Sequence, residues 1–107
     1  MVGHTMLKES ALASRFLKSI ANEHRLQILC TLSQGERSVG EIRETVELRQ
    51  SNLSQQLGRL RQDKLVKTRR EGKMIYYSLS NDKVIRVLDL LYELFCKDEP
   101  DPQQGRA

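Results

Sequence analysis

The sequence predicts a mainly α-helical domain with a small β-hairpin wing, arranged as a winged helix-turn-helix. Apolar residues recur at helical spacing in about five segments of the 107-residue chain. After Asp63 the apolar spacing changes to a period of two, which is typical of strands. A chain of this length suffices for one compact domain, so we expect a single domain over residues 6–96 and a disordered tail over residues 97–107.

Two helices are expected first, an amphipathic one and then an apolar one. In residues 6–20 the apolar side chains, such as Leu12 and Phe16, lie on one face of a helix. Asn22 is a favourable N-cap for a second, apolar helix, and Gly35 is expected to stop it. Because aromatic residues are few and Trp is absent, we expect a core of Leu, Ile and Val side chains.

Two short helices with a tight connection follow. Ser38 and Glu41 have the spacing of a capping box at the start of a third helix. Ser51 opens a fourth helix, in which leucines recur on one face. The connection over residues 47–50 is short enough for a helix-turn-helix.

A basic β-hairpin is expected directly after these helices. Residues 65–70 and 73–79 are β-prone runs, and Glu71 and Gly72 between them are a hairpin signal. A helix-turn-helix followed by a basic hairpin is a winged arrangement, in which the hairpin tip reaches DNA phosphates or the minor groove.

The polar face of the fourth helix has the composition of a DNA-reading surface. A helix face that only contacts solvent usually carries Glu and Lys. Residues 48–62, in contrast, contain no acidic residue. Asn52 and Gln55 are the candidates for base edges, whereas Ser and Arg side chains favour phosphates. The alternative is a helix that is merely polar. The predicted DNA-binding residues are Gln50, Ser51, Asn52, Ser54, Gln55, Gln56, Arg59, Arg69, Arg70 and Lys73.

The last helix, expected from Ser80 or Asn81 to about Cys96, carries more apolar surface than one small domain covers. We therefore expect a homodimer through the first and last helices, with two recognition helices about one DNA turn apart on a palindromic double-stranded operator. The alternative is a monomer whose own core covers this surface. Its apolar residues are Val84, Ile85, Val87, Leu88, Leu90, Leu91, Tyr92, Leu94 and Phe95.

Composition argues against several other classes. No run approaches the roughly 18 to 20 apolar residues of a membrane span, and residues 1–6 lack a signal-peptide stretch, so we expect a cytoplasmic protein without a membrane partner. No phosphate-binding glycine loop or nucleophile elbow occurs, so neither an enzyme nor a cofactor is expected. The rival to DNA binding is a dimeric protein-interaction module that uses the apolar last helix.

Three segments, residues 21–29, 48–57 and 75–79, together resemble the ArsR/SmtB family of bacterial repressors. The match runs in order through nearly all of residues 6–96. The resemblance implies a winged-helix homodimer that leaves its operator when an inducer binds. Many members of the family have His where this chain has Gln56, so base contacts at this position differ from the family pattern.

Metal sensing, which occurs in the family that this chain resembles, requires ligands that the sequence does not offer. The family's thiolate site uses a Cys-x-Cys pair on the second helix, where this chain has Cys30 alone. Its interfacial zinc site uses His on the last helix, but the two histidines here are His4 and His24. Because zinc takes about four ligands, no metal site is predicted, and a metal-responsive repressor is the alternative.

Cys30 on the second helix and Cys96 at the end of the last one resemble the cysteine pair of the BigR, SqrR and HlyU subgroup. That resemblance implies a repressor that senses reactive sulfur species or oxidants through the two thiols. A disulfide or polysulfide bridge between them would release the operator. The alternative is two ordinary buried thiols, because Cys is among the most buried residue types.

Overall fold

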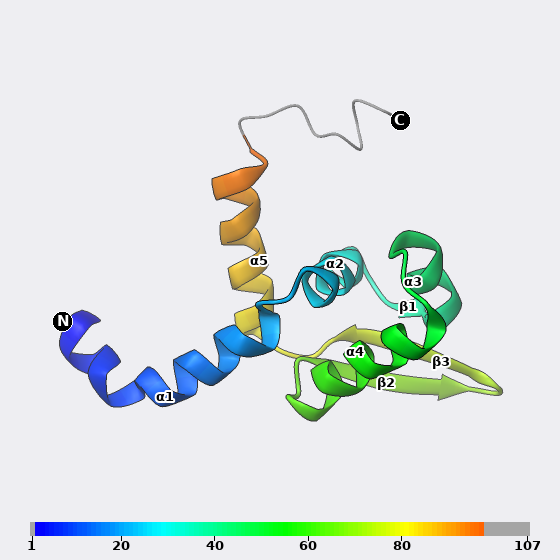
Figure 1. Cartoon of the computed structure of the whole chain (residues 1–107), viewed down its shortest axis with the longest axis horizontal. Coiled ribbons are helices and arrows are strands. Elements are labelled where there is room, and N and C mark those ends of the chain that lie inside the picture. The colour runs from blue at the N-terminus through cyan, green and yellow to red at the C-terminus, as the bar shows by residue number, and fades with distance from the viewer. Residues whose placement is uncertain (1, 98–107) are drawn as a thin grey trace.

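The computed structural model describes residues 2–97, which form a helical domain with a three-stranded antiparallel sheet (Figure 1). The predicted winged helix-turn-helix is confirmed. From residue 98 onward the predicted tail lies outside the described residues. The helices are α1 (Val2–Ile20), α2 (Glu23–Leu32), α3 (Val39–Thr45), α4 (Gln50–Gln62) and α5 (Asp82–Phe95), and the strands are β1 (Arg37–Ser38), β2 (Val66–Glu71) and β3 (Met74–Leu79).

Three helix starts confirm capping residues expected from the sequence. The Asn22 side chain accepts a hydrogen bond from the Arg25 backbone N–H at 3.0 Å and begins α2. Ser38 and Glu41 form both hydrogen bonds of the capping box at the start of α3. Asn81 accepts from a backbone N–H in the first turn of α5. Local hydrogen bonds therefore define these starts.

Two other helix starts differ from the prediction. Helix α1 begins at Val2 rather than near Met6. Helix α4 begins at Gln50, one residue before Ser51, with Arg49 as an N-cap that lacks a side-chain hydrogen bond. The Arg49 carbonyl accepts the first intrahelical bond, from Leu53 at 2.9 Å, so backbone geometry fixes this start without a favourable capping side chain.

The sheet contains a strand that the sequence analysis missed. Its order is β1-β3-β2, with Arg37 opposite Tyr77 and the β2–β3 hairpin making up most of the pairing. Strand β1 has only two residues, too few for a recognisable pattern. At the hairpin tip Gly72 has a φ of 63°, the left-handed conformation that glycine adopts without steric cost.

One apolar cluster holds the helices and the sheet together. Much of α1 and α5 lies outside it, because α1 runs out to one side of the body and α5 rises from it (Figure 1). Within residues 2–97, no helix has both the length and the hydropathy needed to cross a membrane. The buried apolar residues are Ile20, Ile28, Leu29, Leu32, Ile42, Val46, Leu53, Leu57, Leu60, Leu65, Val66, Val84 and Leu88.

Candidate DNA interface and cysteine pair

Helix α4 is the second helix of the helix-turn-helix and leaves a polar face open to solvent. Its three leucines, at positions 53, 57 and 60, are at most 2% exposed and hold the helix on the core. In such a motif the exposed first turns of the second helix enter the major groove. The predicted contact residues here are all exposed except for half-buried Gln56: Gln50, Ser51, Asn52, Ser54, Gln55, Gln56 and Arg59.

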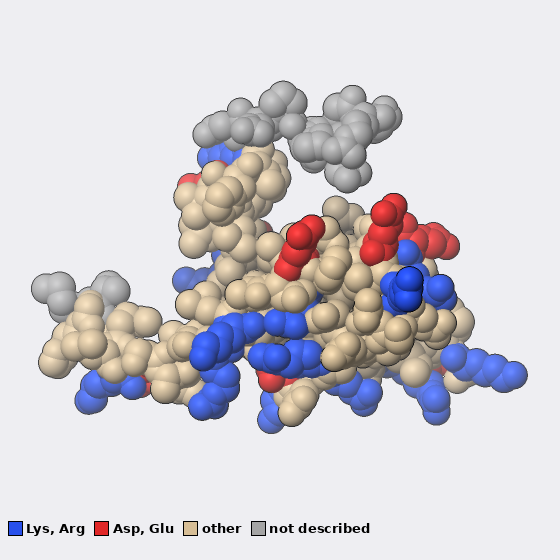
Figure 2. Space-filling model, in the orientation of Figure 1, with Lys and Arg blue, Asp and Glu red and all other residues tan. Residues whose placement is uncertain are grey.

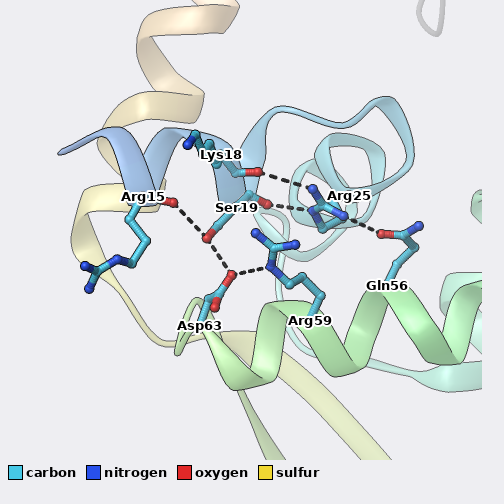
Figure 3. A network of polar contacts seen from close by, with 7 residues as sticks. All are labelled: Arg15, Lys18, Ser19, Arg25, Gln56, Arg59 and Asp63. Carbon is cyan, nitrogen blue, oxygen red and sulfur yellow. Dashed lines mark hydrogen bonds and ion pairs between the residues drawn. The ribbon is translucent and has the colours of Figure 1, made fainter. Parts of the chain in front are cut away.

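Three of these side chains have partners within the domain: Gln50 accepts a long hydrogen bond from Arg43 at 3.5 Å, and Gln56 and Arg59 have the partners drawn in Figure 3. The Gln56 Oε1 accepts a hydrogen bond from the Arg25 guanidinium at 2.7 Å. The Arg59 Nε pairs with the Asp63 carboxylate at 2.7 Å. In contrast, within residues 2–97 no side-chain hydrogen bond holds Asn52 or Gln55, so both are available to a ligand.

The hairpin carries two kinds of cation. Arg70 and Lys73 are exposed beside the turn, and no described carboxylate forms an ion pair with either. Arg69 instead makes a forked contact with Glu36, at 3.0 Å and 2.8 Å, and a 2.7 Å contact with Glu71. Its positive charge is therefore already matched inside the chain.

The Arg69 contact also ties the wing to the body. Glu36 lies just before β1, and the Arg69 guanidinium reaches it over the Tyr76 ring of β3, 4.6 Å from the ring centre. The hydrogen bond from Arg69 is the main cause that lowers the pKa of the Glu36 carboxyl. Glu36 thus stays ionised, and the wing is linked to the chain segment between α2 and β1.

Lys and Arg side chains gather on one part of the surface. In Figure 2 many of them lie along the lower edge and across the middle of the view, over α1, α4 and the hairpin, and a few lie beside the acidic side chains or on α5. The most prominent Asp and Glu on this face lie nearer its upper edge. Such a separation of charge within a chain of net charge +4 favours a polyanionic ligand on the cationic side.

The two cysteines lie on helices that pack against each other. Cys30 lies in α2 and Cys96 is the C-cap residue of α5; both are free and exposed. Partial desolvation by the surrounding protein raises the pKa of the Cys30 thiol, and the charge of Cys96 raises it further. In the single chain, therefore, neither thiol is buried in the core.

Helices α1 and α5 expose apolar side chains and enclose an open groove of about 780 Å³. Leu7 is 76% exposed and Phe95 is 72% exposed, values unusual for large apolar residues in a core-forming helix. Leu12 and Phe16 of α1 face Leu90 of α5 across the groove. These are the helices that the sequence analysis assigned to a dimer interface.

Metal-ligating side chains are dispersed in the described part of the chain. Within residues 2–97, no three His, Cys, Asp or Glu side chains lie close enough together to hold a metal ion. His24 is half-buried near the start of α2, and its Nδ1 has no hydrogen-bond partner there.

Four residues that organise this surface are not directly recognisable as such from the sequence pattern. Arg25 and Asp63 contact Gln56 and Arg59, and Ser19 and Glu36 complete the two groups of contacts. Arg25 lies in one of the segments that carry the family resemblance, which is a signal that could have drawn attention to it. Asp63 lies four residues after Arg59, a spacing at which ion pairs form on a helix, whereas Ser19 and Glu36 have no local pattern because their partners are distant in the sequence.

Comparisons with known proteins agree with this architecture. A family model described as "Bacterial regulatory protein, arsR family" matches residues 22–68. The biofilm growth-associated repressor of Agrobacterium fabrum is 47% identical over 94 residues, which cover 88% of this chain and 80% of that protein. The transcriptional activator HlyU of Vibrio cholerae is 50% identical over 92 residues, which cover 86% of this chain and 85% of that protein.

Solved structures of two relatives have the same fold. The transcriptional repressor BigR from Xylella fastidiosa has a TM-score of 0.86 and 39% identity, covering 92% of this chain and 100% of BigR. Reduced HlyU from Vibrio cholerae has a TM-score of 0.81 and 49% identity, covering 87% of this chain and 98% of that chain. This chain therefore belongs to the ArsR family and is a winged helix-turn-helix transcriptional regulator that binds DNA.

Proposed function

We propose that this regulator is a homodimeric repressor that binds its operator while Cys30 and Cys96 are free thiols and leaves it when they become covalently linked. One observation carries the proposal: both thiols are exposed on packed helices, and the charge of Cys96 affects the pKa of Cys30. Two relatives support the proposal: BigR is a transcriptional repressor, and a structure of HlyU was solved in the reduced form.

The DNA contacts in this proposal come from α4 and the wing. Asn52 and Gln55 read base edges, because they are exposed and lack internal partners. Arg70 and Lys73 neutralise phosphates near the hairpin tip. Ser51, Ser54 and Gln50, which has only a long 3.5 Å contact with Arg43, complete the surface, whereas the closer internal partners of Gln56, Arg59 and Arg69 make these three weaker contributors.

A second copy of the chain would cover the apolar surfaces of α1 and α5. Leu12, Leu90 and Leu94 are 51% to 63% exposed in the single chain, and contiguous apolar surface of this kind marks an interaction site. A two-fold dimer would also present both α4 helices to one duplex.

Two reactions could link the thiols, one with hydrogen peroxide and one with a persulfide. With hydrogen peroxide, one thiolate becomes a sulfenic acid, and the other thiol displaces water to close the disulfide. With a persulfide RSSH, one thiol first gains a sulfur atom and releases RSH. The resulting persulfide and the second thiol then close a trisulfide bridge between Cys30 and Cys96. A second RSSH is the oxidant in this step: it accepts two electrons and two protons and is reduced to RSH and H₂S.

The test measures operator affinity by fluorescence anisotropy before and after treatment with peroxide or a persulfide donor. We expect a loss of about 100-fold, equivalent to about 2.8 kcal/mol of coupling, within the usual range for a switch between two states. Intact mass distinguishes a disulfide, which loses two hydrogens, from a bridge that gains sulfur. Cys30→Ser and Cys96→Ser should bind DNA and fail to respond. Release from either variant would contradict the two-cysteine switch.

Two rival functions give different results. A metal-responsive repressor would release DNA on addition of zinc, cadmium or arsenite near the protein concentration. A protein-interaction dimer would tolerate Gln55→Ala, whereas a repressor loses operator affinity with the dimer intact. We expect no metal response and a loss of binding with Gln55→Ala.

A further inference from the structure

A hydrogen-bonded group of side chains joins the end of α1 to the recognition helix α4 (Figure 3). Its centre is Arg25, near the start of α2. The Arg25 Nε donates to the Ser19 carbonyl at 2.7 Å, and its Nη2 donates to the Lys18 carbonyl at 3.2 Å. Its Nη1 donates to Gln56 Oε1 at 2.7 Å. One guanidinium thus caps the last turn of α1 and holds a side chain of α4.

A second contact joins the same two helices directly. The Ser19 hydroxyl, on a residue that is 2% exposed, donates to Asp63 Oδ2 at 2.5 Å. Arg59 donates to the same oxygen at 2.7 Å. These hydrogen bonds lower the pKa of the Asp63 carboxyl, so it remains an ionised acceptor.

The two contacts lie at separate points along α4. Gln56 and Asp63 are seven residues apart, which corresponds to two helical turns, or roughly 10 Å along the axis. Two separated attachments restrict rotation as well as translation. Apolar packing between helices tolerates small sliding movements, whereas hydrogen bonds weaken steeply when their angles change.

We propose that Arg25 and Asp63 are positioning residues that fix the angle between α1 and α4 and thereby set the half-site spacing that the protein accepts. The inference rests on the proposed homodimer through α1 and α5. In such a dimer the distance between the two recognition helices depends on how each α4 is held relative to its α1. Loosening the attachment broadens the distribution of that distance.

The experiment uses the reduced full-length protein. An operator is first selected from random duplexes with the wild-type protein, and a series is built in which the half-sites move apart or together by one base pair at a time. Affinity is measured across the series for wild type and for Arg25→Met, which keeps an aliphatic side chain and loses the hydrogen bonds. We expect the preference for the native spacing to fall about fivefold or more in the variant.

Arg61→Met on α4 is the matched control. Arg61 is exposed, and no described carboxylate pairs with it, so its loss should lower affinity by the same factor at every spacing. Equal loss at every spacing in Arg25→Met would make Arg25 an ordinary phosphate contact and overturn the proposal. Unchanged affinity and spacing preference in Arg25→Met would overturn it as well.

A second pair of variants decides the matter if Arg25→Met does not fold or dimerise, as judged by thermal unfolding and sedimentation. Asp63→Ala removes the acceptor and should relax the spacing preference, whereas Asp63→Asn keeps an acceptor oxygen and should largely restore it. Identical behaviour of the two Asp63 variants would contradict the positioning role. A wild-type protein without any spacing preference would instead contradict the proposed dimeric repressor.

Discussion

Replacing Arg70 with Gln should flatten the salt dependence of operator binding. Arg70 is exposed on β2 near the hairpin tip, and within residues 2–97 no carboxylate pairs with it. A cation of this kind neutralises a DNA phosphate and releases condensed counterions, about 0.9 per phosphate. Two such contacts per dimer contribute about 1.8 to the slope of log affinity against log salt.

This slope gives a measurable ratio. Between about 50 and 200 mM salt, a slope difference of about 1.8 changes the ratio of wild-type to variant affinity by about 12-fold. Fluorescence anisotropy of the reduced protein on the operator and on a scrambled duplex provides the affinities. Arg70→Gln should weaken binding to both duplexes by the same factor, because phosphate contacts carry no sequence information.

Lys97→Gln is the matched control, because it removes the same charge at the end of α5, away from the wing in Figure 1. It should leave the slope unchanged. Arg69→Gln should change the slope less than Arg70→Gln, because Arg69 is already paired with two carboxylates. An unchanged slope in Arg70→Gln would refute the assignment, and an equal effect in Arg69→Gln would mean that its ion pairs open on DNA.

Three further predictions concern stability and the thiols. Lys64→Gly should stabilise the fold by about 0.5 to 1 kcal/mol, seen in thermal unfolding, because Lys64 has a left-handed φ of 63° that is costly for residues other than glycine. Ser38→Ala should destabilise it by about 1 kcal/mol in urea unfolding, because the Glu41 backbone N–H loses its capping acceptor. Cys96→Ser should move the pH profile of Cys30 alkylation, followed by mass, to lower pH, because the neighbouring charge that raises the Cys30 pKa is removed. An unchanged profile would mean that the two sulfurs lie too far apart to interact.

Features that depend on neighbouring residues could be predicted from the sequence. The capping box of Ser38 and Glu41 and the N-cap at Asn22 are set by hydrogen bonds across three positions, and both occur in the structure as expected. The leucines of α4 are buried as their spacing predicts. The helix-turn-helix and the hairpin follow from such local patterns, which is why the fold class could be identified.

Contacts between distant residues could not be predicted in this way. Arg25 and Gln56 are 31 positions apart, and Arg69 and Glu36 are 33 positions apart. Composition indicated a DNA-reading surface, but a Gln that holds an Arg inside the domain and a Gln that reads a base look alike in a sequence. Strand β1 could not be predicted for a related reason. Two residues have no periodicity, and only their pairing with β3 defines them as a strand.

The cations of this surface fall into two groups, those with a described carboxylate partner and those without one. A count of Lys and Arg in the sequence does not distinguish them, although they should contribute differently to DNA affinity. Arg59 and Arg69 each have a carboxylate partner, so binding a phosphate through either would first require an intramolecular ion pair to open. Arg70 and Lys73 have no such cost in the described part of the chain and should supply the salt-dependent affinity. The slope of log affinity against log salt for the wild type should therefore reflect the number of cations without a carboxylate partner that contact phosphates. Among the described residues Arg61 of α4 is unpaired as well, so a slope that remained steep after Arg61, Arg70 and Lys73 were all removed would indicate that the carboxylate partners release their arginines when DNA binds.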